Sequence, residues 1–221
     1  MKKFLRISFY VSGCIILAFG ITLNTKAGLG ISPLISMPYS ISEITGLNFS
    51  ALTFLTYSVF IAIQFLIDKE SRNVKLFFQL PFSFVFSLLL EVFGRCIAAA
   101  PDILWVKLLV LTAALVFTGI GISMTVNMDY IPNPADGLAR SVGKALRKDM
   151  GFGKNTIDCI SVVITCLCGL IFAGKIIGVG IGTLLAVIFV GRVVKVFNIL
   201  CGNKMIRAAG LPEIVYLNKE E

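Results

Sequence analysis

Six long apolar runs dominate the sequence and fix the class of fold it can adopt. Each is about 17–25 residues long, the length an α-helix needs to cross the roughly 30 Å hydrocarbon core of a bilayer. The expected spans are 4–23, 51–67, 76–100, 104–126, 156–173 and 176–197. Only 14% of the residues are charged, whereas soluble domains carry about 25%. The sequence therefore predicts an all-α multi-pass membrane protein with six transmembrane helices.

The distribution of Lys and Arg predicts how the chain is oriented. If the N-terminus lies in the cytoplasm, sixteen of the twenty Lys and Arg residues fall in cytoplasmic segments. The other four are Lys26, Arg95, Lys107 and Lys175. Cytoplasmic loops of membrane proteins carry an excess of these cations, so we expect both termini in the cytoplasm. The same bias accounts for the net charge of +8, and the expected partner is the lipid bilayer rather than nucleic acid.

The two halves of the chain contain the same features in the same order. A shift of 101 residues places Gly20 on Gly121 and Pro33 on Pro134. Each half has a span, a break rich in glycine and proline, a short amphipathic stretch and two more spans. Because three is odd, the second half crosses the membrane in the opposite sense, as in the inverted repeats of many secondary transporters. The predicted units are 1–100 and 101–198, followed by a cytoplasmic tail at 199–221.

The two breaks are the predicted binding site. Irregular backbone at membrane depth is tolerated only where it is buried in protein or lines a water-filled cavity, and paired breaks in two halves point to a transporter's site. We expect Asp136 to be the first ligand-binding residue, with Asn133, Ser32 and Thr183 beside it. The residues expected to shape the breaks are Gly30, Pro33, Pro134, Gly137, Gly180 and Gly182.

Two alternatives remain open at the breaks. Asp136 is equally typical of a helix N-cap that binds the free N–H groups of the first turn, and this role is compatible with ligand binding. The segments 32–44 and 136–148 fit either a re-entrant hairpin or a helix that lies on the membrane surface.

Three charged residues in the spans are further candidates, for a coupling or gating role. Glu91 and Arg95 lie one turn apart in the third span, and Asp158 lies near the start of the fifth. Ionisable groups within a membrane are functional by default. The plain alternative is that each forms an ion pair near the membrane surface, Glu91 with Arg95 and Asp158 with Lys154.

Several classes of chemistry are not expected. The chain has no histidine, which removes the commonest metal ligand and general base. Its six cysteines show no metal-binding or disulfide spacing, and there is no phosphate-binding loop of the kind found in ATPases. We therefore expect no enzyme activity, no cofactor and no metal.

Three short motifs carry a resemblance to a known family. The stretches 28–33, 133–138 and 180–185 are similar to motifs of the YczE/YitT-type bacterial membrane proteins, and the resemblance covers most of 4–197. It implies a protein of the bacterial plasma membrane with a fold of this kind. It implies no substrate.

The function predicted from these features is transport or export of a small molecule. Its site would lie near the middle of the membrane between the two breaks, with a proton or cation as a candidate coupling ion. Alternating access would move one repeat against the other. The alternative is an accessory or scaffold protein that uses the same helices without a solute path.

Overall fold

The computed structural model describes residues 2–69, 74–148 and 150–211, and these form helices joined by loops, with no β-strand among them. Six helices are long and apolar enough to cross a membrane. They are α1 (Lys2–Ala27), α3 (Phe49–Ile67), α4 (Val74–Cys96), α5 (Leu104–Met128), α7 (Met150–Ala173) and α8 (Ile181–Phe197) together with its continuation to Ala208. Large apolar side chains point outward, among them Trp105, Phe4 and Phe172, as a lipid-facing surface requires. The predicted class is confirmed.

Two short helices interrupt this series, α2 (Pro33–Thr45) and α6 (Pro134–Ala145). Neither is long enough to span a bilayer. Each begins with a proline, whose fixed φ suits the first position of a helix and whose missing N–H is not needed there. Helix α2 is followed by Gly46, which has a left-handed φ of 72°, and a glycine in this conformation commonly ends a helix.

The cap of α6 differs from the alternative raised for Asp136. The capping residue is Asn133, whose side-chain oxygen accepts a hydrogen bond of 3.0 Å from the Ala135 N–H. Asp136 is the third residue of the helix and caps nothing. Ser32 holds the corresponding position in α2, but its side chain makes no capping hydrogen bond.

The sixth span is placed differently from its prediction. Helix α8 begins at Ile181, five residues later than expected, because Gly174 and Gly178 adopt positive φ values of 65° and 84°. At its other end the helix continues through a π-helical turn (Asn198–Gly202) into α9 (Asn203–Ala208). The sixth candidate span therefore runs to Ala208, into the region predicted as the tail, and residues 212–221 lie outside the described part of the chain.

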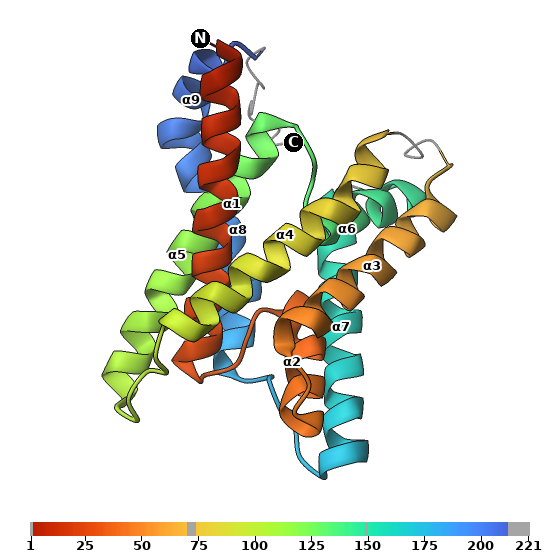
Figure 1. Ribbon diagram of the computed structural model, residues 1–221, viewed down its shortest axis with the longest axis vertical. Coiled ribbons are helices and arrows are strands. Elements are labelled where there is room, and N and C mark those ends of the chain that lie inside the picture. The colour runs from red at the N-terminus through yellow and green to blue at the C-terminus, as the bar shows by residue number, and fades with distance from the viewer. Residues whose placement is uncertain (1, 70–73, 149, 212–221) are drawn as a thin grey trace.

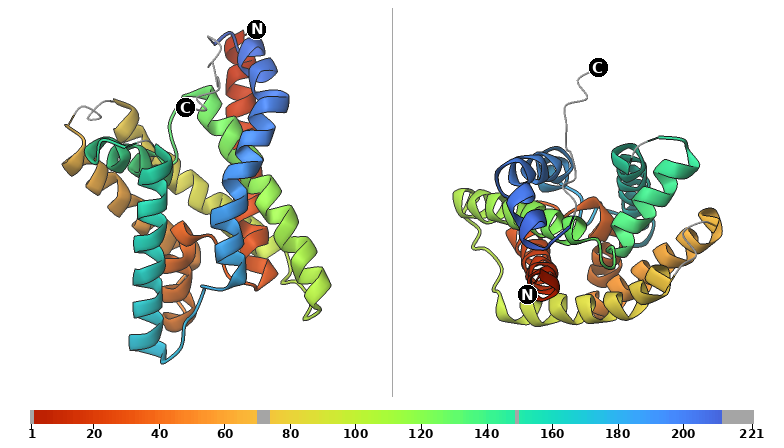
Figure 2. Two further views of the ribbon diagram at one scale, coloured as in Figure 1. Left: turned by 180° about the vertical axis from the view of Figure 1, so that it is seen from behind. Right: turned by 90° about the horizontal axis from the view of Figure 1, so that it is seen from above.

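The long helices form two groups that each draw on both halves of the sequence. Helix α1 packs along α5, and α8 packs on α5. Helices α2, α3, α6 and α7 pack together as a second group, and α4 crosses between them with contacts to α1 and α3 (Figures 1 and 2). We call these the α1–α5–α8 group and the α2–α3–α6–α7 group.

Glycines bring α1 and α5 into close contact. These two helices run in opposite directions (Figure 1). A Cβ atom added to Gly121 would lie 2.5 Å from the backbone nitrogen of Leu17, and one added to Gly20 would lie 2.5 Å from that of Thr118. Small residues are the usual means by which membrane helices approach closely.

A pair of glutamines fixes the start of α6 against α3 and α4. Gln64 donates hydrogen bonds to the side-chain oxygen of Gln79 at 3.1 Å and to the carbonyl of Pro134 at 3.0 Å. Gln79 donates in return to Gln64 at 3.3 Å. Gly137 lies against this pair and has no room for a Cβ atom. These contacts hold the beginning of α6 within the bundle.

Candidate functional site

One cavity lies between the two helix groups, and the beginnings of both short helices line it. Ser32 and Pro33 come from the start of α2, and Asn133, Ala135 and Asp136 come from the start of α6. The two breaks predicted from the sequence therefore meet at one place. The apolar wall comes from α1, α2, α5 and α8 and includes Leu17, Ile21, Leu34, Ile35, Ile122, Ala186, Val187 and Val190. The cavity volume open to water-sized molecules is about 40 Å³, which is room for a few waters or a small ion.

Asp136 is a buried carboxylate on this cavity. Its residue is 7% exposed, and within the described part of the chain it accepts no hydrogen bond. Helix α6 is not among the six candidate spans. Burial raises the pKa of the Asp136 carboxyl, the Lys154 ammonium opposes this shift and the Asp158 carboxylate adds to it. The surroundings of the Asp136 carboxyl group therefore stabilise its charged form poorly.

Asp158 and Lys154 place a second carboxylate and an ammonium on the same cavity. They lie one turn apart on α7, and the Lys154 Nζ is 3.1 Å from an Asp158 oxygen. The Asp158 side chain is 4% exposed and that of Lys154 is 30% exposed. The ion pair considered as the plain alternative for Asp158 is present, and it lines the cavity rather than the outer surface.

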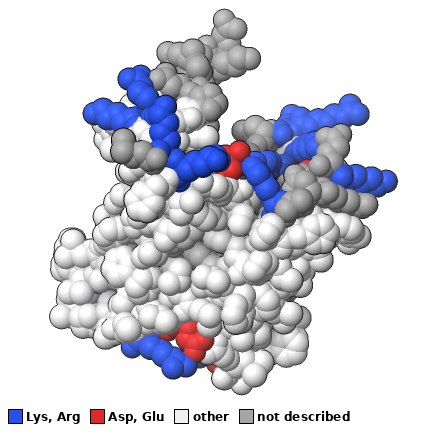
Figure 3. Space-filling model, turned by 45° about the horizontal axis from the view of Figure 1, so that its top comes forward, with Lys and Arg blue, Asp and Glu red and all other residues white. Residues whose placement is uncertain are grey.

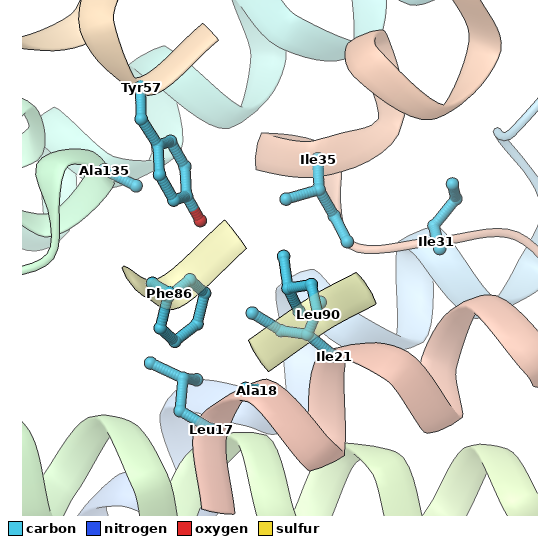
Figure 4. Packing of buried hydrophobic residues seen from close by; sticks show 9 residues of the cluster. All are labelled: Leu17, Ala18, Ile21, Ile31, Ile35, Tyr57, Phe86, Leu90 and Ala135. Atoms are coloured by element: carbon cyan, nitrogen blue, oxygen red, sulfur yellow. The ribbon is translucent and has the colours of Figure 1, made fainter. Parts of the chain in front are cut away.

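Two residues with hydroxyl groups that were missed in the sequence also line the cavity, Tyr57 on α3 and Thr118 on α5. Figure 4 shows the Tyr57 hydroxyl pointing away from α3 into the space bordered by Ile35, Phe86 and Ala135. Neither residue belongs to a recognisable motif, since each is one of several polar side chains scattered along an apolar helix. Lys154 could be predicted from the sequence as the ion-pair partner of Asp158, because it lies four residues earlier.

Three predicted residues lie away from the cavity. Glu91 and Arg95 form an ion pair on α4, with the Arg95 side chain 78% exposed, and neither is among the residues that line the cavity. Thr183 is buried at the start of α8, where its hydroxyl accepts a hydrogen bond of 3.1 Å from the Gly180 N–H. The site brings together Asp136, Asn133, Ser32 and Asp158, and not these three.

The predicted glycines meet in a second arrangement, which we call the glycine clasp: residues 28–31 and 178–182. The Ile31 N–H donates to the Gly178 carbonyl at 3.0 Å, and the Gly182 N–H donates to the Leu29 carbonyl at 2.7 Å. A Cβ atom on Gly30 would lie 2.5 Å from the Gly180 nitrogen. A wider pocket of about 350 Å³ is lined by the clasp together with Thr25, Tyr39 and Ile177.

These features define a multi-pass helical membrane protein with a charged internal cavity. The chain belongs to the DUF6198 family, a family of unknown function whose sequence model matches residues 4–199. It is 25% identical over 193 residues to the uncharacterized protein YyaS of Bacillus subtilis, an alignment that covers 86% of this chain and 90% of YyaS. No solved structure matches it significantly. The narrower resemblance to YczE/YitT-type proteins stays a prediction.

Proposed function

We propose that this protein transports a small solute across the bacterial plasma membrane, with the cavity at Asp136 as its binding site. One observation carries the proposal: the beginnings of two short, proline-led helices from opposite halves of the chain line one cavity that holds a buried carboxylate. Transporters of several folds bind their substrates at the ends of such interrupted helices near the membrane centre.

The contacts between α1 and α5 support the proposed inverted repeat. Gly20 lies against Thr118, and Gly121 lies against Leu17. A shift of 101 residues converts one pair into the other. Such reciprocal contacts are expected at a two-fold axis, where residue i meets j and j meets i. The opposite directions of α1 and α5 (Figure 1) fit two units of opposite orientation.

The way the halves are combined refines the proposed motion. Each helix group contains helices from both halves of the chain. A helix group is therefore a better candidate for a rigid moving unit than a sequence repeat. We propose that the α1–α5–α8 group moves against the α2–α3–α6–α7 group, with the cavity between them. The loops 28–32 and 174–180 both connect the two groups, and their glycines supply the backbone freedom a hinge needs.

The proposed orientation is supported by the charge distribution and can be tested directly. Figure 3 shows Lys and Arg gathered at the end of the molecule where α1 begins, with a broad uncharged belt below it. In a background that lacks the six native cysteines, Lys175→Cys should react with a membrane-impermeant thiol reagent added to intact cells. Lys148→Cys should react only after the cells are opened. The reverse pattern would overturn a cytoplasmic N-terminus.

The binding site is tested with Asp136→Asn. We expect a screen of the purified protein against metabolites, ions and drugs to find a compound that raises the thermal unfolding midpoint. A ligand at about a hundred times its Kd stabilises by about 2.7 kcal/mol when it binds only the folded state. Asp136→Asn should abolish this stabilisation and leave the unliganded protein folded, because asparagine has nearly the same shape and Asp136 makes no capping bond.

The matched control is Asp102→Asn, which removes an exposed carboxylate in the loop before α5 and should leave the ligand response unchanged. A response that survives in Asp136→Asn would refute the site. Failure to find any stabilising compound would count against transport and favour a non-transporting accessory protein that acts through a partner complex.

A further inference from the structure

We infer that the ligand held by Asp136 is a small monovalent cation, an alkali-metal ion or a small ammonium. This inference deepens the proposed function and rests on it. The occupant is repelled by an internal cation, the Lys154 ammonium, which also lines the cavity.

The first reason is the balance of charge around the cavity. Among the residues that line it, three are charged: Asp136, Asp158 and Lys154. Lys154 is paired with Asp158. Arg140 lies one turn after Asp136 on the same helix, but it is exposed and is not part of the lining. One buried carboxylate is thus left without a partner, and a single positive charge completes the set.

The second reason is the position of Asp136 itself. Its residue is 93% buried, its carboxylate lines the cavity, and no described residue donates a hydrogen bond to it. Burial of an ionised carboxylate without a partner costs several kcal/mol, so such groups are paired, bind a cation or take up a proton. A group kept in this state and directed into a cavity is a binding group rather than a structural one.

The surroundings favour a cation over an anion. Two carboxylates face the cavity, and each would repel an anion. At the start of α6, the usual anion site in a broken helix, the Ala135 N–H is already bound by Asn133. Tyr57 and Thr118, which each carry a neutral hydroxyl, line the same space, and oxygen atoms are the ligands that hard cations prefer. The cavity volume of about 40 Å³ matches an ion or a small ammonium.

Lys154 places a fixed positive charge beside the site. Its ammonium pairs with Asp158 at 3.1 Å and also attracts the Asp136 carboxylate electrostatically. A cation that enters beside Asp136 is repelled by this ammonium, which remains with Asp158. Removal of the Lys154 charge should therefore strengthen cation binding, which would not follow if Lys154 served only to pack α7.

The experiment uses the purified full-length protein. Its thermal unfolding midpoint is followed while NaCl, KCl, NH4Cl or methylammonium chloride is added at constant ionic strength, with N-methylglucamine chloride as the bulky balancing salt. We expect at least one of these cations to raise the midpoint by roughly 5–10 °C at saturation. The four salts distinguish an alkali-metal ion from an ammonium. Sodium formate and acetamide, added at a fixed concentration of each cation, test an anion and a neutral solute.

The variants and pH sharpen the result. Asp136→Asn should lose the cation response, Asp136→Glu should keep it, Lys154→Met should shift it to about tenfold lower concentration, and Asp102→Asn should leave it unchanged.

The response should weaken as pH falls, because protonation of Asp136 removes its charge. The groups that act on Asp136 are Lys154 and Asp158 on α7, Arg140 on α6 and the Tyr57 hydroxyl on α3. A response to formate or acetamide and to none of the cations would overturn the cation assignment while the transport site stands. If no probe in this set and no compound in the wider screen stabilises the protein, both proposals fall.

Discussion

Gly121→Leu should strongly destabilise the bundle. A Cβ atom at this position would lie 2.5 Å from the backbone nitrogen and 2.6 Å from the Cα of Leu17. Shortening the Leu17 side chain would not relieve this clash, because the nearest atoms are main chain. Overpacking of a tight contact costs about 1–3 kcal/mol, and more where the backbone itself must move. We expect a loss of at least about 3 kcal/mol and a fall in the unfolding midpoint of roughly 6–12 °C.

The control for Gly121→Leu is Gly191→Leu on α8. Gly191 also lies in an apolar helix, but nothing would come within 4 Å of an added Cβ atom. Leucine favours the helix over glycine by about 0.8–1 kcal/mol, so this change should be neutral or stabilising. Thermal unfolding in one detergent, with the yield of monodisperse protein, measures both variants. Equal behaviour of the two would show that α1 and α5 do not depend on this close approach.

The second large effect is expected at the glycine clasp, from Gly30→Ala. Gly30 has a φ of +103°, and a Cβ atom there would lie 2.5 Å from the Gly180 nitrogen and 2.8 Å from the Thr183 hydroxyl. The substitution therefore forces the two segments apart and breaks the hydrogen bonds between residues 29–31 and 178–182. We expect a loss of roughly 3 kcal/mol, the sum of backbone strain and disrupted contacts. The proposed binding response should weaken as well, because the clasp joins the two helix groups.

Gly28→Ala separates strain from contact. Gly28 lies two residues away in the same segment and has a φ of +66°, but an added Cβ atom would meet nothing within 4 Å. It should cost only the strain of a left-handed residue, about 1–2 kcal/mol. Hydrogen exchange of the Ile31 and Gly182 amides would report the clasp directly: fast exchange in Gly30→Ala and slow exchange in Gly28→Ala. Slow exchange in both would refute the steric account.

The sequence predicted the class of fold and the order of the spans better than their boundaries. Long apolar runs have few alternatives, so the six candidate spans were found in the right order. The start of the last span was misplaced because 176–180 is apolar and glycine-rich, a composition that fits a helix and a buried extended segment equally. The cap of α6 could have been predicted correctly from the sequence. Pro134 favours the first helical position, which makes Asn133, the residue before it, the cap.

The composition of the site depended on tertiary contacts that sequence spacing does not encode. Asp136 was singled out from the break around it, and it does lie in the cavity. Tyr57 and Thr118 reach the same cavity from helices far away in the chain, and nothing local marks them. Glu91 and Arg95 were predicted as functional charges because they lie in an apolar run. They form an ion pair with each other on α4 and do not line the cavity.

The interleaving of the two halves has a consequence for how the chain is made. Helix α1 leaves the ribosome first, yet the partner for its glycine face is α5, synthesised only after α4 is complete. Helix α2 likewise waits for α7, whose Thr165 hydroxyl meets that of Ser36 at 2.8 Å. Until then these buried polar groups face lipid or the insertion machinery. The nascent first half therefore lacks these contacts of α1 and α2, and we expect the bundle to become protease-resistant only once the last helices have inserted. Fragments ending before α5 should be degraded in the cell, and a separately expressed second half should rescue them.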